Sequence, residues 1–108
     1  IKIINSNPNL KAIYSTSSRN TVAMCEAIRE TGRNDIITIG SDVFPESIKY
    51  IENGVLNAVI HKRHSSQAYE AMQVLSNIIV KGQIPTSEII LCDSVIVMKS
   101  NVSQYKKP

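Results

Sequence analysis

The chain has 108 residues, of which 43% are hydrophobic and 19% are charged, and its mean hydropathy is −0.05. This profile predicts one soluble domain and excludes a membrane-spanning segment, because no window approaches the ~18 uninterrupted apolar residues of a membrane helix. Residues 1–10 also lack the basic start and apolar run of a signal peptide, although the first residue is Ile rather than Met. The net charge of +3 comes from basic residues spread along the chain, which does not by itself indicate a nucleic-acid-binding protein.

The two cysteines, Cys25 and Cys92, stand alone in apolar surroundings. No Cys-x-x-Cys pair and no histidine at a metal-ligand spacing accompanies them. We therefore expect both to be reduced and buried as small hydrophobic residues.

The first half of the chain alternates short β-branched runs with stretches of helical periodicity. Residues 11–15 predict a strand, and residues 20–31 predict a helix that Gly32 ends in the left-handed conformation. Residues 35–40 contain the apolar run Ile-Ile-Thr-Ile, which is typical of a strand covered on both faces. This order predicts a strand, a helix and a second strand.

The middle of the chain repeats that pattern. Pro45 suits the first turn of a helix, and Asn53 with Gly54 ends it. Residues 56–60 then predict a third strand.

A long helix follows the third predicted strand. Ser65 or Ser66 can cap its start, and Gly82 stops it. Its apolar residues recur at helical spacing, so we expect them, and Tyr69 beside them, to face the core. They are Ala68, Ala71, Met72, Leu75, Ile78 and Ile79.

Two further β-like runs, residues 88–92 and 95–98, flank Asp93 and Ser94 as either a hairpin or one bent strand. The predicted order is βαβαβαββ. We expect one α/β unit of three layers, α/β/α, with a mostly parallel sheet and three right-handed parallel crossovers.

Polar residues follow each of the first three predicted strands. In a parallel sheet the carboxyl ends of the strands share one edge, where ligands bind. The polar segments at this edge are 15–18, 41–42 and 61–64. Short hydroxyls, one carboxylate and a few donors suit a small polyhydroxylated molecule.

Each of these residues also has a structural interpretation. The serines of segment 15–18 can cap the first helix. Asp42 can stabilise the N-terminus of the second helix by roughly 0.3–1 kcal/mol. Lys62 with Arg63 can be a solvated pair, so the sequence leaves both interpretations open.

Enzymatic chemistry finds little support. No G-x-S-x-G elbow is present, and nothing orients His61 or His64 as a base, so we do not expect an enzyme. For a metal site, these two histidines lack a supporting carboxylate or thiol at a ligand spacing. For a phosphate-binding loop, the four glycines stand singly rather than in a glycine-rich run. We therefore expect no metal, no phosphate-binding glycine loop and no cofactor.

Four stretches of the chain, spread over about residues 9–101, resemble one family. They are Ala12-Ile13-Tyr14 through Met24, Ile37-Thr38-Ile39-Gly40-Ser41-Asp42 with Pro45-Glu46, Ile51 through Ile60, and Gln67-Ala68-Tyr69. Together they resemble the C-terminal lobe of the periplasmic-binding-protein-like (type I) sugar-binding domain, which LacI-type repressors share with ribose-type sugar-binding proteins. The strand that ends in Gly-x-Asp is the most specific element.

The resemblance implies a set of ligand-binding residues. It places Asp42 where the family's carboxylate binds sugar hydroxyls. Ser17 stands where the family often has Asn, and Lys62 and His64 stand where it favours Gln followed two residues later by Pro or an aromatic residue. Because Lys62 adds a positive charge, the implied ligand is a sugar or a phosphorylated or acidic sugar.

The resemblance further implies that residues 1–108 form a single partial domain, one lobe of two that close on the ligand by hinge motion. An isolated lobe is then expected to bind sugar weakly or not at all.

The expectation drawn from the resemblance is the effector-binding domain of a cytoplasmic LacI-type transcriptional regulator, without membrane contact. Its sugar effector would act allosterically on operator DNA, bound by a domain outside this sequence. We expect a homodimer through the outer sides of the first two predicted helices. The alternative, from a different class, is the substrate-binding protein of a sugar ABC transporter.

Overall fold

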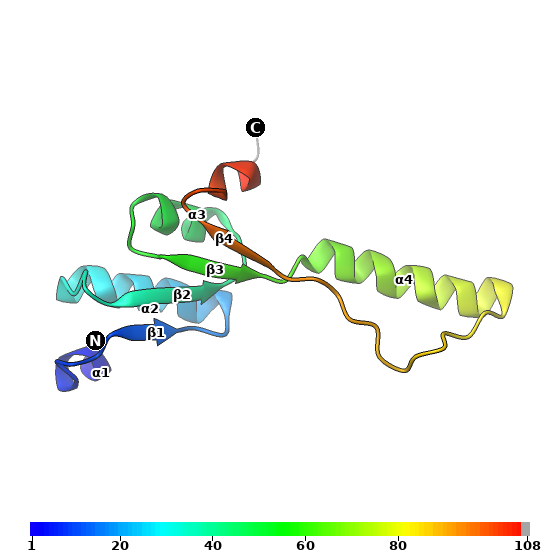
Figure 1. Cartoon of the computed structure of the whole chain (residues 1–108), viewed down its shortest axis with the longest axis horizontal. Helices are drawn as coiled ribbons and strands as arrows, with labels where there is room; N and C mark the ends of the chain where they lie inside the picture. Colours follow the sequence, from blue (N-terminus) through cyan, green and yellow to red (C-terminus); the bar gives the residue numbers. More distant parts are fainter. Residues whose placement is uncertain (107–108) are drawn as a thin grey trace. The chain divides into compact units, whose positions relative to one another are not determined.

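The computed structural model describes residues 1–106 (Figure 1). The elements in chain order are α1 (Lys2–Ser6), β1 (Ala12–Tyr14), α2 (Ser18–Thr31), β2 (Ile37–Ser41), α3 (Pro45–Glu52), β3 (Ala58–His61), α4 (His64–Lys81), β4 (Val95–Met98) and the 3-10 helix η1 (Val102–Tyr105). They divide into two compact units. The first comprises Ile1–His61 and the described residues from Val95 onward, and the second comprises Lys62–Ser94.

The first unit contains a four-stranded sheet in the order β1-β2-β3-β4. β1 pairs with β2, and β2 with β3, in parallel, whereas β4 pairs antiparallel with β3. The predicted α/β class and mostly parallel sheet are confirmed. The prediction of three parallel crossovers is wrong, because the last strand runs antiparallel.

The ends of the helices follow local sequence signals. α2 ends at Gly32, which adopts φ 67°, and α4 ends at Gly82, with φ 65°. Both angles lie in the left-handed region that glycine adopts without steric cost. α3 begins at Pro45, as the fixed φ of proline predicts.

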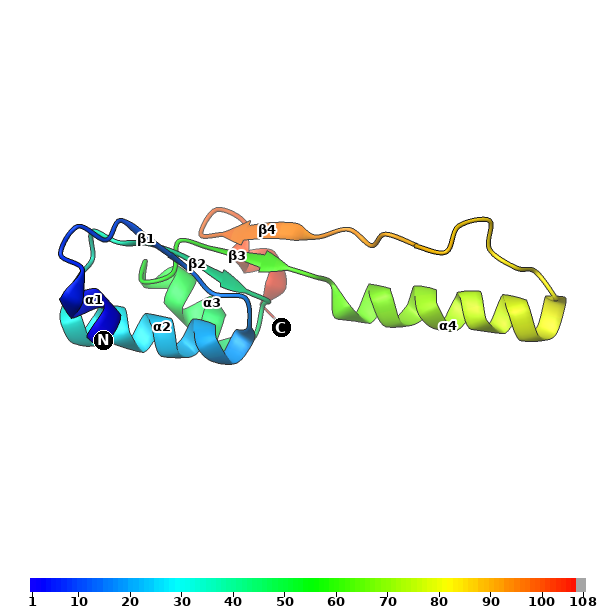
Figure 2. The ribbon, with the colours of Figure 1, turned by 90° about the horizontal axis from the view of Figure 1, so that it is seen from below.

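The core of the first unit lies on one face of the sheet. α2 and α3 lie on that face, and α1 lies beside α2 (Figure 2). Met24 and Cys25 of α2 pack with Ile51 of α3 against Val59 and Val97 of the strands. Ile4, Ile28 and Ile36 form a second buried cluster. Cys25 is completely buried and free, as predicted.

The opposite face of the sheet is apolar and exposed. Tyr14 and Ile37 are 55% exposed and Ile96 is 62% exposed. These side chains alternate along their strands with buried neighbours such as Thr38 and Val97. The first unit thus provides two layers, and the third layer of the predicted fold stays a prediction.

The second unit departs from three predictions. α4 begins at His64 after Arg63, whose φ is 52°, so neither Ser65 nor Ser66 caps it. Its apolar face is exposed rather than buried: Met72 is 64% exposed, and α4 has no buried residue. Residues 88–92 form no strand, because no neighbouring strand pairs with them.

Within the described residues no helix is both long and apolar enough to span a membrane.

Candidate ligand-binding site at the carboxyl ends of the strands

The loop that follows β1 is attached to the end of β2. The Ser15 amide donates to the Ile39 carbonyl at 2.8 Å, which extends the parallel pairing by one residue. The Ser41 hydroxyl donates to the Ser15 carbonyl at 2.7 Å, and the Ser41 side chain is fully buried. These contacts bring segment 15–18 beside residues 41–42, as the shared sheet edge predicts.

Thr21 of α2 also joins the loop after β1 to the end of β2. Its hydroxyl donates to the Ser17 carbonyl at 2.8 Å and accepts a hydrogen bond from the Ser41 amide at 3.0 Å. Gly40 allows this approach, because a Cβ at that position would fall on the Thr21 methyl group and 2.8 Å from its hydroxyl oxygen. Thr21 therefore fixes the distance between the two loops that carry Ser17 and Asp42.

Ser17 is the N-cap residue of α2. Its hydroxyl accepts a hydrogen bond from the Asn20 amide at 3.2 Å, which satisfies one of the helix's unpaired donors. The structural role proposed for these serines is thus confirmed for Ser17. Its side chain stays partly exposed, so a role in ligand contact remains a prediction.

Asp42 directly follows β2 and adopts φ 67°. Asp enters this left-handed region more readily than most non-glycine residues. Its amide donates to the Ile60 carbonyl of β3 at 2.9 Å, and its carboxylate accepts a hydrogen bond from the Ser18 hydroxyl at 3.3 Å. The predicted carboxylate is thus half-buried at the carboxyl end of the parallel strands, beside the Ser18 hydroxyl.

Lys62 and His64 belong to the second unit. Lys62 is partly buried, and its carbonyl accepts a hydrogen bond from the Gln67 side chain at 2.8 Å. His64 is the first residue of α4 and is exposed. The structure brings Ser17 and Asp42 together within the first unit, while the ligand contacts assigned to Lys62 and His64 remain predictions.

His61 is the last residue of β3. Its Nδ1 is buried without a hydrogen-bond partner among the described residues, and its ring meets that of Tyr105 edge to face at 5.6 Å. Between residues 1 and 106, no observed hydrogen bond joins a serine hydroxyl to the His61 ring, so a Ser–His pair is not observed there. The described residues contain no cluster of three or more His, Cys, Asp or Glu side chains able to hold a metal ion.

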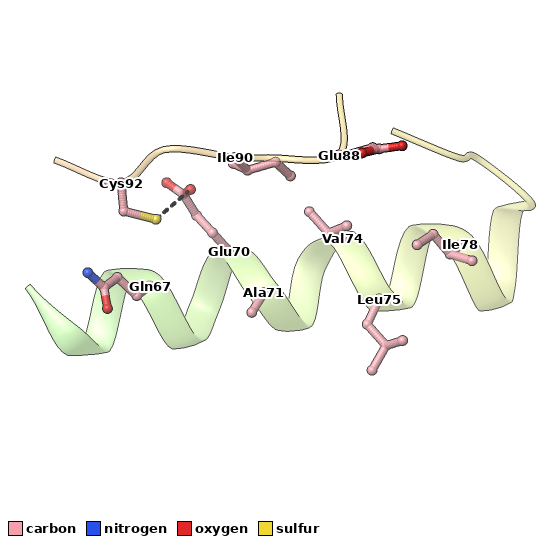
Figure 3. A pocket seen from close by; sticks show the side chains of 9 residues that line it. All are labelled: Gln67, Glu70, Ala71, Val74, Leu75, Ile78, Glu88, Ile90 and Cys92. Carbon is pink, nitrogen blue, oxygen red and sulfur yellow. Dashed lines mark hydrogen bonds between the residues drawn. The ribbon is translucent and has the colours of Figure 1, made fainter. Parts of the chain in front are cut away.

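Two pockets are lined by residues other than the four predicted ligand residues. In the second unit, a largely apolar pocket of about 380 Å³ lies between α4 and the segment that includes Glu88, Ile90 and Cys92 (Figure 3). There the Cys92 thiol donates to the Glu70 carboxylate at 3.6 Å, and Cys92 is only partly buried, contrary to expectation. In the first unit, α3 and η1 border a shallow groove that includes Phe44 and Tyr105. Neither pocket is lined by any of the four predicted ligand residues.

Three supporting residues were not predicted individually. Ser18 contacts the Asp42 carboxylate, Thr21 joins the two loops, and the buried Ser47 hydroxyl lies 3.3 Å from the Asp42 carbonyl oxygen. The run of hydroxyl residues at the start of α2 was a signal for Ser18 and Thr21. It could not identify their hydrogen-bond partners, which lie 24 and 20 residues away in the sequence.

The chain is similar to curated proteins whose names describe sugar binding. The chain is 28% identical over 108 residues to the D-apiose import binding protein of Actinobacillus succinogenes, covering 97% of this chain and 34% of the relative. It is 23% identical over 100 residues to the D-allose-binding periplasmic protein of Escherichia coli, covering 88% and 32%. The chain thus spans about a third of the length of these relatives.

A solved structure shares the fold. It is an ABC transporter solute-binding protein from Burkholderia graminis in complex with D-arabinose, with a TM-score of 0.85 and 24% identity. The match covers 98% of this chain and 38% of that one.

These relatives correct several expectations drawn from the resemblance. They are named as transporter or periplasmic binding proteins, so the LacI-type regulator and its cytoplasmic location are wrong. Operator DNA and a homodimer likewise find no support among them. Their names describe binding proteins rather than enzymes.

The family itself is shown by a match over most of the chain. The model of the periplasmic binding protein domain matches residues 2–83, which include the whole of β1 to β3 and both Ser17 and Asp42. The Gly-x-Asp motif that ends in Asp42 lies within this match. The chain therefore belongs to the periplasmic binding protein domain family.

Proposed function

We propose that this chain is the C-terminal lobe of a periplasmic sugar-binding protein that supplies an ABC transporter. Such a protein binds its sugar between two lobes and releases it for import, without catalysing a reaction. The observation that carries the proposal is the position of Asp42, a half-buried carboxylate that accepts a hydrogen bond from the Ser18 hydroxyl at the carboxyl ends of parallel strands. The relatives named for D-apiose import and D-allose binding support the same class of ligand.

The chemistry of the proposed contacts suits a polyhydroxylated ligand. An ionised carboxylate accepts hydrogen bonds from O–H donors, and these charge-assisted bonds are roughly twice as strong as neutral ones. Ser17 adds a hydroxyl that both donates and accepts. Lys62 and His64 would contribute donors from the segment after β3, where a lysine ammonium also suits an acidic or phosphorylated sugar.

The isolated lobe is expected to bind sugar weakly. A two-lobe protein surrounds its ligand with contacts from both sides, and one lobe supplies only part of them while the remaining ligand surface stays in water. The test therefore uses the intact protein.

Isothermal titration calorimetry with D-allose, D-arabinose and D-fucose tests the proposal. We expect at least one of these sugars to bind, and Asp42→Ala to weaken that binding by about 10- to 100-fold, in line with roughly 1.5–3 kcal/mol for hydrogen bonds to a charged group. Glu30→Ala is the matched control, because it removes an exposed carboxylate near the opposite end of α2. Equal affinity of Asp42→Ala and wild type would show that Asp42 is not a ligand-binding residue.

A further inference from the structure

The Asp42 carboxylate is contacted by a residue of a helix that is distant in sequence. Ser18 is the first residue of α2, and its hydroxyl donates to Asp42 Oδ2 at 3.3 Å across a separation of 24 residues. Both side chains are partly buried. The contact therefore lies at the edge of the sheet rather than in bulk solvent.

The main chain of Asp42 is held by two other elements. Its amide donates to the Ile60 carbonyl of β3 at 2.9 Å, and its carbonyl oxygen lies 3.3 Å from the hydroxyl of Ser47 in α3. Ser47 is fully buried. These two contacts hold a residue whose φ of 67° is uncommon outside glycine.

With the main chain held from β3 and α3, the contacts of the Asp42 side chain decide how its carboxylate is oriented. A carboxylate on a short side chain can adopt several staggered rotamers, and a hydrogen-bond partner favours one of them. The Ser18 hydroxyl on α2 is such a partner. Ser18 is itself fixed by the helix start that the Ser17 cap and the Thr21 contact define.

We propose that Ser18 is a positioning residue of the sugar site, which holds the Asp42 carboxylate in the orientation that accepts hydrogen bonds from ligand hydroxyls. This inference rests on the proposed function. A carboxylate has about four acceptor positions, so the bond from Ser18 occupies one and restricts the directions of the others. Ordering the carboxylate before the ligand arrives lowers the entropic cost of binding.

The experiment measures affinity in the intact protein with the panel D-allose, D-arabinose and D-fucose. Ser18→Ala is expected to weaken sugar binding about 10-fold, while Ser18→Thr, which keeps the hydroxyl, stays within about twofold of wild type. Thr31→Val is the matched control, since it removes a hydroxyl at the other end of α2. In an Asp42→Asn background, Ser18→Ala is expected to cost less than about threefold, because the carboxylate that it orients is gone.

A measurement without ligand tests the contact directly. Three-bond NMR couplings of the Asp42 side chain are expected to report one rotamer in wild type and in Ser18→Thr, and changed rotamer populations in Ser18→Ala. A merely structural role of Ser18 would shift the unfolding midpoint without changing these couplings.

The outcomes separate the two proposals. Unchanged affinity in Asp42→Asn, or a wild type that binds none of the three sugars, counts against the proposed function, and the couplings still test the contact. The role of Ser18 alone would be overturned if Asp42→Asn weakened sugar binding while Ser18→Ala left the affinity unchanged. Averaged Asp42 couplings in wild type would overturn it as well.

Discussion

The Thr21 hydroxyl accepts a hydrogen bond from the Ser41 amide at 3.0 Å, and both side chains are completely buried. The contact joins the first turns of α2 to the last residue of β2. Because water cannot replace either partner, this bond holds the edge of the sheet at which Ser17 and Asp42 lie.

Replacing Thr21 by Val tests that contact. The variant keeps the branched shape but leaves the buried Ser41 amide without its acceptor, so we expect the free energy of unfolding to fall by about 1–3 kcal/mol. Urea denaturation of the variant against wild type measures the loss. In Thr31→Val the hydroxyl removed bonds the Ala27 carbonyl one turn earlier in the same helix, and we expect a change below about 0.5 kcal/mol. Equal losses in both variants would contradict a special role for Thr21.

Gly40 is predicted to tolerate no side chain while Thr21 keeps its methyl group. In Gly40→Ala the new Cβ would overlap the Thr21 methyl, and overpacking of this kind costs about 1–3 kcal/mol or more. Thr21→Ser removes that methyl and retains the hydroxyl, so the double variant should recover part of the stability that Gly40→Ala loses. Additive losses in thermal unfolding would show that the two positions do not clash.

The fold could be predicted where local chemistry decides it. Gly32 and Gly82 end helices because their φ values lie in the left-handed region, and Pro45 starts one because its own φ is preset. Residues 88–92 show the limit of this reasoning: they have the composition of a strand but no neighbour to pair with. A strand forms only when a segment pairs with a neighbouring strand, so the composition of the segment alone cannot guarantee that it forms one.

The candidate site could be predicted in position but not in detail. The rule that ligands bind at the carboxyl ends of parallel strands located Ser17 and Asp42 correctly at one edge. The contacts of Ser18 and Thr21 depend on how α2 packs against β2, which the spacing of residues along the chain does not encode.

The Arg33–Asp35 pair predicts a pH dependence of stability. The hydrogen bond from Arg33 lowers the pKa of Asp35 from 3.8 to about 2. Since the folded pKa lies below the unfolded one, the stabilisation is present above about pH 4 and is lost as the pH falls through about 2. Asp35→Asn should therefore be less stable than wild type near neutral pH, and the difference should vanish near pH 2 in denaturation curves. A difference that persists unchanged at the lower pH would contradict the assignment.

The two cysteines are predicted to react differently with iodoacetamide. Burial, assisted by the neighbouring Glu26, raises the pKa of Cys25 to about 11, and its side chain is inaccessible. The pKa of Cys92 is also raised, by desolvation and then by Glu70, but this thiol is partly exposed. Because the thiolate is the nucleophile, native protein at mildly alkaline pH should be alkylated slowly at Cys92 and not at Cys25. Intact-mass spectrometry measures the rates, denatured protein provides the control, and rapid native labelling of Cys25 would contradict its burial.

Lys62 is predicted to select for negative charge on the ligand. The resemblance aligns Lys62 with a position where the family favours Gln, whose amide both donates and accepts, and a lysine ammonium there would favour a phosphate or carboxylate on the sugar. In the intact protein we expect Lys62→Gln to weaken binding of D-allose 6-phosphate about 10-fold more than binding of D-allose, consistent with roughly 1.5 kcal/mol for a charged hydrogen bond. The preference should also shrink as salt is added, because ions screen a partly exposed charge. Lys99→Gln, which removes an exposed lysine beyond β4, controls for the change in net charge. Calorimetry with both ligands measures the two affinities. Equal effects of Lys62→Gln on the neutral and the phosphorylated sugar would show that Lys62 does not recognise the ligand's charge. The proposed ligand class would then be limited to neutral sugars.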